Sequence, residues 1–291
     1  MSGGVRTVVQ KLTGFGALLP LGLVVLSAGP IRAQANVPPE LFQDPHVREE
    51  LGVNEFTAPS IEKIFRELQG LRPVPYEKVR RPISAGATYP TRFQLALNLG
   101  ALLGEGFLTV ESQRSDRIDE LGRALLRMSK ALGISDRITR HSKSLMEEGL
   151  KGEWDRMRRE LAQTQEDVEA AMMELRDEEI THVIALGGWL RGLEIGALAV
   201  GERFTPERAA ILQRIELVDY FNDRLNTLNP RLRKLPLVIR LVADLKTIQS
   251  LLEKPGGAGL DAGDVRQVQQ VTSALLDAIA ARPSTDEAAA R

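Results

Sequence analysis

The residues best suited to chemistry lie in one apolar segment, residues 180–200. Arg191 and Glu194 stand three positions apart there, so on a helix they share a face and can pair. A buried charge must be matched by a partner or solvated in a cavity. The pair is therefore either a structural ion pair at the edge of the domain or part of a polar patch inside a pocket. The second interpretation predicts a ligand-binding patch made of Arg191, Glu194, Trp189, His182, Asn98 and Glu105.

A metal centre is a further possibility to weigh, because Glu179-x-x-His182 matches half of the ligand set of carboxylate-bridged di-iron bundles. A complete site needs a second such pair and two more inward glutamates. Gln43 and Ile138, not glutamates, stand three positions before the other two histidines. The sequence therefore predicts no metal ligand and no cofactor.

Catalytic motifs give little support to an enzyme. The chain has no cysteine and no G-x-S-x-G nucleophile motif. Gly257-x-Gly259-x-x-Ala262 resembles a dinucleotide fingerprint, but it follows Pro255 rather than a strand, so we interpret it as a linker. The carboxylates stand mostly on charged, solvated helix faces. The sequence therefore predicts no catalytic residue.

Five glycines are expected to serve helix packing. Gly188, Gly192 and Gly196 recur every four residues and form one stripe, although each glycine costs a helix roughly 1 kcal/mol relative to alanine. Something must lie close to the backbone there. Gly100 and Gly104 have the same spacing and could face the stripe, as small residues do where helices pack closely. A ligand in the groove or a broken helix at residues 187–188 are the alternatives.

Two basic clusters stand beside prolines in short connections: Lys78-Arg80-Arg81 and Arg231-Arg233-Lys234. Either could touch anionic lipid or another polyanion. Neither has aromatic residues interleaved with its cations. Solvated loop charge is the default interpretation.

The elements that must position these residues are all helical. Aromatic residues make up only 4% of the chain, which suits helices packed through aliphatic side chains better than a sheet. Apolar spacing and cap residues predict a single multi-helix bundle of about eight or nine helices, near residues 60–70, 91–110, 115–132, 135–149, 153–176, 177–200, 205–228, 235–252 and 264–281.

The central segment is nearly apolar enough for a membrane span. Arg191 and Glu194 in its middle would each cost about 2.5–3.5 kcal/mol in lipid, so we expect a buried helix instead. The predicted organisation is a signal peptide (1–35), an irregular lead-in (36–59), a helical core domain (60–253), a Gly-rich linker (254–263), a C-terminal amphipathic helix (264–281) and a disordered tail (282–291).

The first 35 residues have the layout of a bacterial-type secretory signal. Arg6 and Lys11 precede an apolar stretch over residues 12–26, and Ala33-Gln34-Ala35 is a small-x-small cleavage site. An uncleaved anchor is the alternative, but the apolar stretch has about 15 residues where a span needs about 20. We predict cleavage after Ala35, a periplasmic or secreted protein, and no integral span afterwards. Without cysteine, no disulfide stabilises it.

The predicted function is non-catalytic: an exported helical protein that binds a partner protein or an apolar small molecule in the cell envelope. Removal of residues 1–35 leaves a net charge of −4, which gives no global bias toward nucleic acid. The alternative is a carboxylate-dependent envelope enzyme with no recognisable motif. A carrier needs a cavity of some hundreds of Å³; an enzyme needs a cleft where titratable groups converge. A protein that binds a partner should expose an apolar patch, expected on the last helix.

Overall fold

The computed structural model describes residues 61–83, 88–175 and 177–281. In this part of the chain 81% of the residues are helical and no strand is present, which confirms the predicted all-α bundle. The predicted signal peptide (1–35), lead-in (36–59) and tail (282–291) lie outside the described residues.

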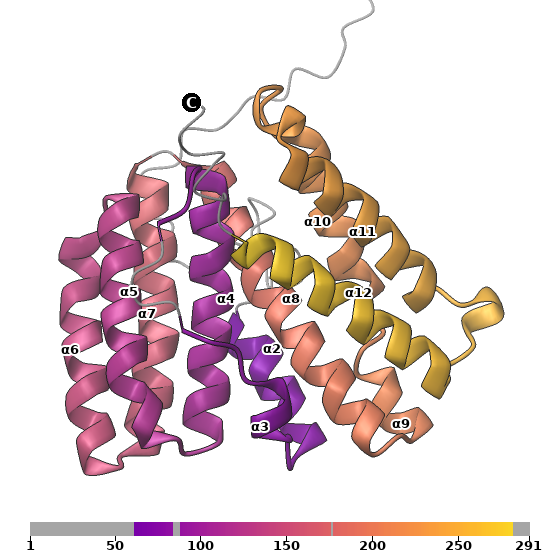
Figure 1. Ribbon diagram of the computed structural model, residues 1–291, viewed down its shortest axis with the longest axis horizontal. Helices are drawn as coiled ribbons and strands as arrows, with labels where there is room; N and C mark the ends of the chain where they lie inside the picture. Colours follow the sequence, from indigo (N-terminus) through magenta and orange to yellow (C-terminus); the bar gives the residue numbers. More distant parts are fainter. Residues whose placement is uncertain (1–60, 84–87, 176, 282–291) are drawn as a thin grey trace, which may run out of the picture. The chain divides into compact units, whose positions relative to one another are not determined.

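The α-helices of the described part are labelled in Figure 1: α2 (Ile61–Leu68), α3 (Tyr76–Val79), α4 (Arg92–Glu111), α5 (Ile118–Leu132), α6 (Ser135–Lys151), α7 (Trp154–Glu174), α8 (Glu178–Glu202), α9 (Pro206–Ala210), α10 (Ile215–Thr227), α11 (Pro236–Leu252) and α12 (Ala262–Ala280). Two differences from the predicted elements stand out. The short helix α3 forms within a stretch expected to be a loop, and the helix expected over residues 205–228 is divided into α9 and α10.

The division between α9 and α10 follows from the contacts of residues 211–214. Thr205 caps α9 as expected, since its hydroxyl accepts from the Arg208 amide at 3.2 Å. Beyond the break, Leu212 packs into the space left by Gly196, where an added Cβ would lie 2.9 Å from Leu212 Cδ2. The side chain of Gln213 donates to the main-chain oxygen of Leu252 at 3.2 Å. These tertiary contacts outweigh the local preference for one continuous helix.

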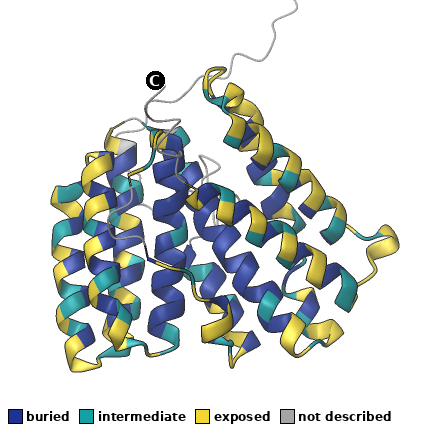
Figure 2. Cartoon of the chain, viewed as in Figure 1, coloured by how far each residue is buried: buried dark blue, intermediate teal, exposed yellow. Residues whose placement is uncertain are grey.

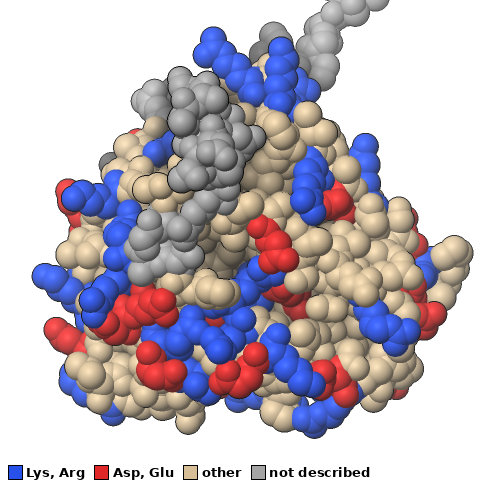
Figure 3. Space-filling model, in the orientation of Figure 1, with Lys and Arg blue, Asp and Glu red and all other residues tan. Residues whose placement is uncertain are grey.

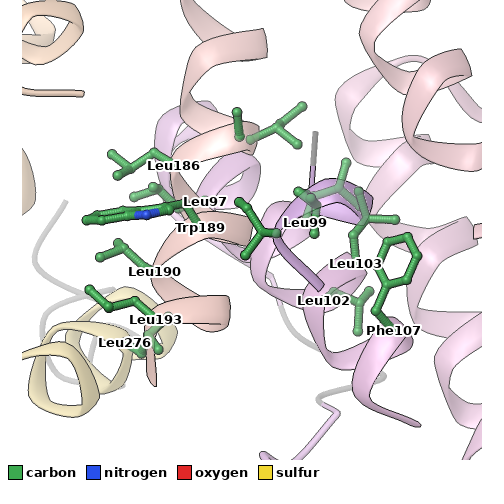
Figure 4. Close-up of a cluster of buried hydrophobic side chains, with 14 of the residues drawn as sticks. Leu97, Leu99, Leu102, Leu103, Phe107, Leu186, Trp189, Leu190, Leu193 and Leu276 are labelled. Atoms are coloured by element: carbon green, nitrogen blue, oxygen red, sulfur yellow. The ribbon is translucent and has the colours of Figure 1, made fainter. Parts of the chain in front are cut away.

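Helix α8 is the central element of the bundle. It lies against α4, α12, α2, α7 and α10, and Figure 1 shows it between α4 and α12. Both α4 and α8 are apolar on all sides, and such a helix is stable in water only when neighbours cover it. Figure 2 shows both helices mostly buried. Figure 4 shows the large side chains that they contribute to the core, among them Leu97, Leu99, Leu102, Leu103 and Phe107 of α4 and Leu186, Trp189, Leu190 and Leu193 of α8.

By length and hydropathy alone, two helices of the described residues resemble membrane spans: Arg92–Glu111 and Glu179–Glu202. Within the protein, however, 94% and 89% of their apolar windows are buried. Packing in the core therefore accounts for their apolar composition.

The C-terminal helix α12 is docked on the bundle, against α8, α11 and α4. It begins with a capping box, in which the Asp264 amide donates to Asp261 Oδ1 at 2.8 Å and the Asp261 amide donates to Asp264 Oδ2 at 2.9 Å. Its apolar stripe is buried at Val265, Val268 and Leu275. The helix is thus part of the core.

The side-chain amides of two α4 residues, Gln94 and Asn98, donate hydrogen bonds to the last carbonyl groups of α12. A helix end leaves its final carbonyl groups without partners along the helix. Gln94 Nε2 donates to the oxygens of Ile279 and Ala281 at 2.8 and 2.7 Å, and Asn98 Nδ2 donates to the oxygen of Ile279 at 2.8 Å. This side-chain cap fixes the C-terminal end of α12 against α4.

Candidate functional site

Arg191 is the centre of a buried group of charges. Its side chain is fully buried. Its Nη2 atom lies 2.6 Å from a carboxylate oxygen of Glu105 on α4, and its Nη1 atom lies 2.6 Å from a carboxylate oxygen of Glu194 on α8. Nη2 also donates to the main-chain oxygen of Val79 at 2.7 Å. The stem of Arg191 has room because the facing residue on α4 is Gly104, where an added Cβ would lie 3.0 Å from Arg191 Cγ.

Arg81, which follows α3, is the second cation of the group. Its Nε and Nη2 atoms donate to the two carboxylate oxygens of Glu194 at 2.8 and 2.6 Å. Its Nη1 donates to Asp277 of α12 at 2.7 Å, and Nη2 also donates to the main-chain oxygen of Ser273 at 3.1 Å. We refer to Arg81, Glu105, Arg191, Glu194 and Asp277 as the charge cluster. It carries two cations and three carboxylates, and it joins α4, α8, α12 and the segment after α3.

The sequence identified only part of this cluster. Arg81 was expected among solvated loop charges together with Lys78 and Arg80, but it is half-buried and paired with Glu194. Asp277 was not singled out. Lys78 and Arg80 do lie at the surface, where each pairs with a glutamate at 2.8 and 2.7 Å.

The electrostatics of the cluster favour the ionised forms of Glu194 and Arg81. Burial raises the pKa of Glu194, but the hydrogen bond from Arg81 and the charges of Arg191 and Arg81 outweigh burial and lower it. Burial lowers the pKa of Arg81, whereas the hydrogen bond and charge of Glu194 raise it by more. Glu194 is therefore held as a carboxylate, acting as an acceptor for both arginines rather than as a proton donor.

A cavity of about 310 Å³ opens beside the charge cluster. Four members of the cluster line its polar end: Arg81, Glu105, Arg191 and Asp277. Most of the remaining wall is apolar and comes from α4, α5, α12 and the segment after Arg81: Pro82, Ile83, Ala101, Leu102, Met128, Leu276, Ile279, Ala280 and Ala281. The volume lies at the lower end of the range for small-molecule pockets.

Asn98 lies in the wall of the same cavity. Both hydrogens of its side-chain amide are donated to main-chain oxygens, of Gln94 and Ile279, each at 2.8 Å. The amide oxygen receives no hydrogen bond from any described residue, although the side chain is more than nine-tenths buried. Asn98 therefore offers the cavity an acceptor.

Two residues of the predicted patch lie elsewhere. Trp189 packs against Phe221 of α10, with ring centroids 5.3 Å apart. His182 Nδ1 lies 2.6 Å from the hydroxyl of Tyr220, also on α10. Burial lowers the pKa of His182 to about 4, with a smaller contribution from the charge of Arg224, so Nδ1 of the neutral ring accepts a hydrogen bond from the Tyr220 hydroxyl. The structure thus brings together Arg191, Glu194, Glu105 and Asn98, and it separates Trp189 and His182 from them.

The glycine stripe of α8 is filled by side chains of α2. An added Cβ on Gly188 would lie 2.3 Å from Ile61, and one on Gly192 would lie 2.6 Å from Ile64. Gly196 faces Leu68 and Leu212, both at 2.9 Å. The groove therefore receives the ridge of a neighbouring helix.

Helix α4 crosses α8 where Gly100 of α4 and Gly187 of α8 let the two backbones approach. An added Cβ on Gly100 would lie 1.9 Å from the Ile184 oxygen and 2.8 Å from the Gly188 nitrogen. Gly187, which was not assigned a packing role from the sequence, would meet the Leu97 oxygen at 2.0 Å. Gly104 faces Arg191 instead of the stripe. The two backbones are in contact, and no side chain fits between them.

The Glu179-x-x-His182 pair makes other contacts. Glu179 Oε1 accepts from the Asn229 amide at 2.7 Å, while His182 bonds Tyr220. Among the residues that the structure describes, no group of three or more His, Asp or Glu side chains is arranged to hold a metal ion.

One polar cluster has no counterpart in the sequence analysis. His141 of α6 is buried between two carboxylates of α7, with Nδ1 2.6 Å from Glu160 Oε1 and Nε2 2.7 Å from Asp167 Oδ2. These two contacts tie α6 to α7. The cluster does not line the cavity.

Comparisons with known proteins identify no relative of this chain. No protein-family model, no curated protein and no solved structure matches it.

Proposed function

We propose that this chain is an exported, non-catalytic protein that holds a small, mainly apolar molecule in the cavity beside the charge cluster. The observation that carries the proposal is the cavity itself, about 310 Å³ with an apolar wall and one polar end. Pockets that bind small molecules have this combination, in which apolar area supplies affinity and a few polar groups fix the orientation. The ligand would lie in the cavity lined by α4 and α12. It would not lie in the glycine groove of α8, because side chains of α2 fill that groove.

The polar end of the cavity favours a ligand with a hydrogen-bond donor. The four cluster members that line the cavity, two arginines and two carboxylates, have formal charges that sum to zero, so the cavity calls for no charged ligand. Asn98 adds an acceptor without a donor among the described residues. A hydroxyl or amine of the ligand would donate to this acceptor. We therefore expect an apolar molecule with a hydroxyl or amine at one end.

Acid–base catalysis at this cavity has less support. An acid or base needs a carboxylate free to exchange a proton near its working pH. Glu105 and Glu194 both accept from arginines, and the pKa of Glu194 is lowered. The pairing is that of a structural network, so the enzyme alternative would need groups other than these.

Binding of a partner protein through the last helix also has less support. Large apolar side chains exposed on the described residues are scattered singly, at Leu150, Leu175 and Ile239. None of them belongs to α12, whose apolar stripe is buried. Scattered residues of this kind do not form an interaction patch.

The test combines retained ligand with a cavity-filling variant. The protein is expressed with its export segment in a bacterium, extracted from the envelope, and examined by native mass spectrometry. We expect a chain that begins at Asn36 and carries an added mass that is lost on denaturation. Ala101→Phe, which fills the cavity from α4, should abolish the added mass. Ala162→Phe is the matched control, since Ala162 is a partly buried alanine of α7 that does not line the cavity.

The outcomes separate cleanly. Retention of the same molecule by folded Ala101→Phe protein would show that the cavity is not the site. Absence of any added mass, together with no binding of apolar amines or alcohols by the purified protein, would overturn the proposal. Loss of the molecule in both variants would indicate a general loss of structure, which circular dichroism would reveal.

A further inference from the structure

The connection between α10 and α11 has an excess of cations. Between Asp223 and Asp244 the sequence has no acidic residue, whereas it has five cations: Arg224, Arg231, Arg233, Lys234 and Arg240. The whole chain is close to neutral, with 38 basic and 39 acidic residues. The excess of cations is therefore local.

Three of these cations are exposed. Arg231, Arg233 and Lys234 lie on and beside a short 3₁₀ turn, Leu232–Lys234, and no carboxylate of the described residues lies within 4.0 Å of them. Figure 3 shows Lys and Arg side chains gathered at the top of the view, where Figure 1 places this connection. The other basic cluster behaves differently, because Lys78, Arg80 and Arg81 all have carboxylate partners. We call Arg231, Arg233 and Lys234 the basic tip.

The backbone of the basic tip is held in place. The Arg231 amide donates to the side-chain oxygen of Asn229 at 3.0 Å, and the Asn229 amide donates to Glu179 of α8 at 2.7 Å. Pro230 and Pro236 flank the turn and restrict the backbone further. The three cations are thus presented on a fixed support, so that little conformational entropy is lost on binding.

Apolar side chains stand between and after the cations. Leu232 lies between Arg231 and Arg233, and Leu235 and Leu237 follow Lys234. All three leucines are only partly buried, and Ile239 is 59% exposed. The segment contains no aromatic residue on which a nucleic-acid base could stack. Cations beside accessible aliphatic side chains match the headgroup and upper acyl regions of an anionic bilayer.

We infer that the basic tip docks this protein on the surface of an anionic lipid bilayer. The inference does not depend on the cavity, since the tip lies on another connection. Each exposed cation at such a surface contributes on the order of a five-fold increase in partitioning, so the three together should contribute about 100-fold. A net-acidic protein would then bind with one defined orientation, with the α10–α11 connection toward the lipid.

The test is co-sedimentation of the exported, processed protein with vesicles of phosphatidylcholine containing about one-third phosphatidylglycerol. We expect binding to these vesicles, little binding to pure phosphatidylcholine, and loss of binding at high salt because the contact is electrostatic. The triple variant R231Q/R233Q/K234Q should bind about 100-fold more weakly.

A matched control removes the same charge elsewhere. Arg127, Lys130 and Lys143 of α5 and α6 are exposed and have no carboxylate within 4.0 Å among the described residues, so R127Q/K130Q/K143Q changes net charge equally. This control should bind as the unchanged protein does. Equal weakening of both triple variants, or no binding to anionic vesicles, would overturn the inference. Tip-dependent binding to a soluble polyanion without vesicle binding would also overturn it and identify a different partner.

Discussion

Arg191 shows why the buried cation of this bundle is an arginine. Its donors reach Glu105, Glu194 and the main-chain oxygen of Val79, which belong to three different elements. A guanidinium has five N–H groups in a fixed plane, whereas the lysine ammonium has three donors at a single point. One arginine can therefore join α4, α8 and the end of α3, and lysine at this position could not satisfy all three partners.

Replacement of Arg191 tests how much this junction contributes. Arg191→Met should destabilise the fold by about 3–5 kcal/mol, because two buried glutamates lose their shared partner while the side-chain volume is nearly kept. The measurement is the free energy of unfolding in urea. Arg123→Met is the control: it removes an exposed pair with Asp119 and should leave the stability almost unchanged. Equal effects of the two substitutions would mean that burial of the cluster is unimportant for stability.

Helical geometry explains which site residues could be predicted. At about 100° per residue, Glu194 lies roughly 60° around α8 from Arg191, so the two side chains share a face. Asn98 and Glu105 are seven residues apart and also share a face of α4. His182 stands nine positions before Arg191, about 180° around the helix, which is why it faces Tyr220. The spacing of His182 and Arg191 in the sequence therefore already indicated that the two side chains lie on opposite sides of α8.

Arg81 could not be predicted in the same way. Its pairing with Glu194 spans 113 positions and depends on how the segment after α3 folds back onto α8. No periodicity connects such residues. A loop cation that is buried by tertiary packing has the same local sequence as one in solvent.

At the scale of elements, the glycines of α8 allow two neighbouring helices, α4 and α2, to pack closely against it. Gly187 allows the backbone of α4 to approach, and Gly188, Gly192 and Gly196 accept the apolar ridge of α2. The long helices were predictable because their apolar residues repeat with helical spacing. Helix α3 and the break between α9 and α10 were not, because they depend on contacts of residues far apart in the chain.

The same substitution at two glycines of α8 should have opposite effects. Gly187→Ala would place a Cβ 2.0 Å from the Leu97 oxygen, a backbone atom, so α4 must move away and stability should fall by at least about 1–3 kcal/mol. Gly201→Ala meets nothing within 4 Å in the last turn of α8 and should raise stability by about 0.5–1 kcal/mol. Thermal unfolding of both variants is the measurement. Destabilisation by both would show that glycine flexibility, and not the close approach of α4, is what matters.

At the scale of the whole molecule, stability should depend on pH through groups that the fold holds in one charge state. His182 has a folded pKa of about 4, from burial and then the charge of Arg224, against about 6.5 in the unfolded chain. Between these values the unfolded state binds more protons, so stability falls as the pH is lowered through this window. Glu194 adds to the loss at lower pH, because its lowered pKa favours the folded state only while it is ionised.

Acidification from pH 7 to 4.5 should therefore cost the fold about 2 kcal/mol through His182. His182→Asn separates this contribution from the others, because asparagine can still accept from the Tyr220 hydroxyl but does not titrate. The variant should lose correspondingly less stability over the same window, whatever its stability at pH 7. The measurement is the urea midpoint at several pH values. Parallel pH profiles for the two proteins would assign the acid sensitivity to other groups.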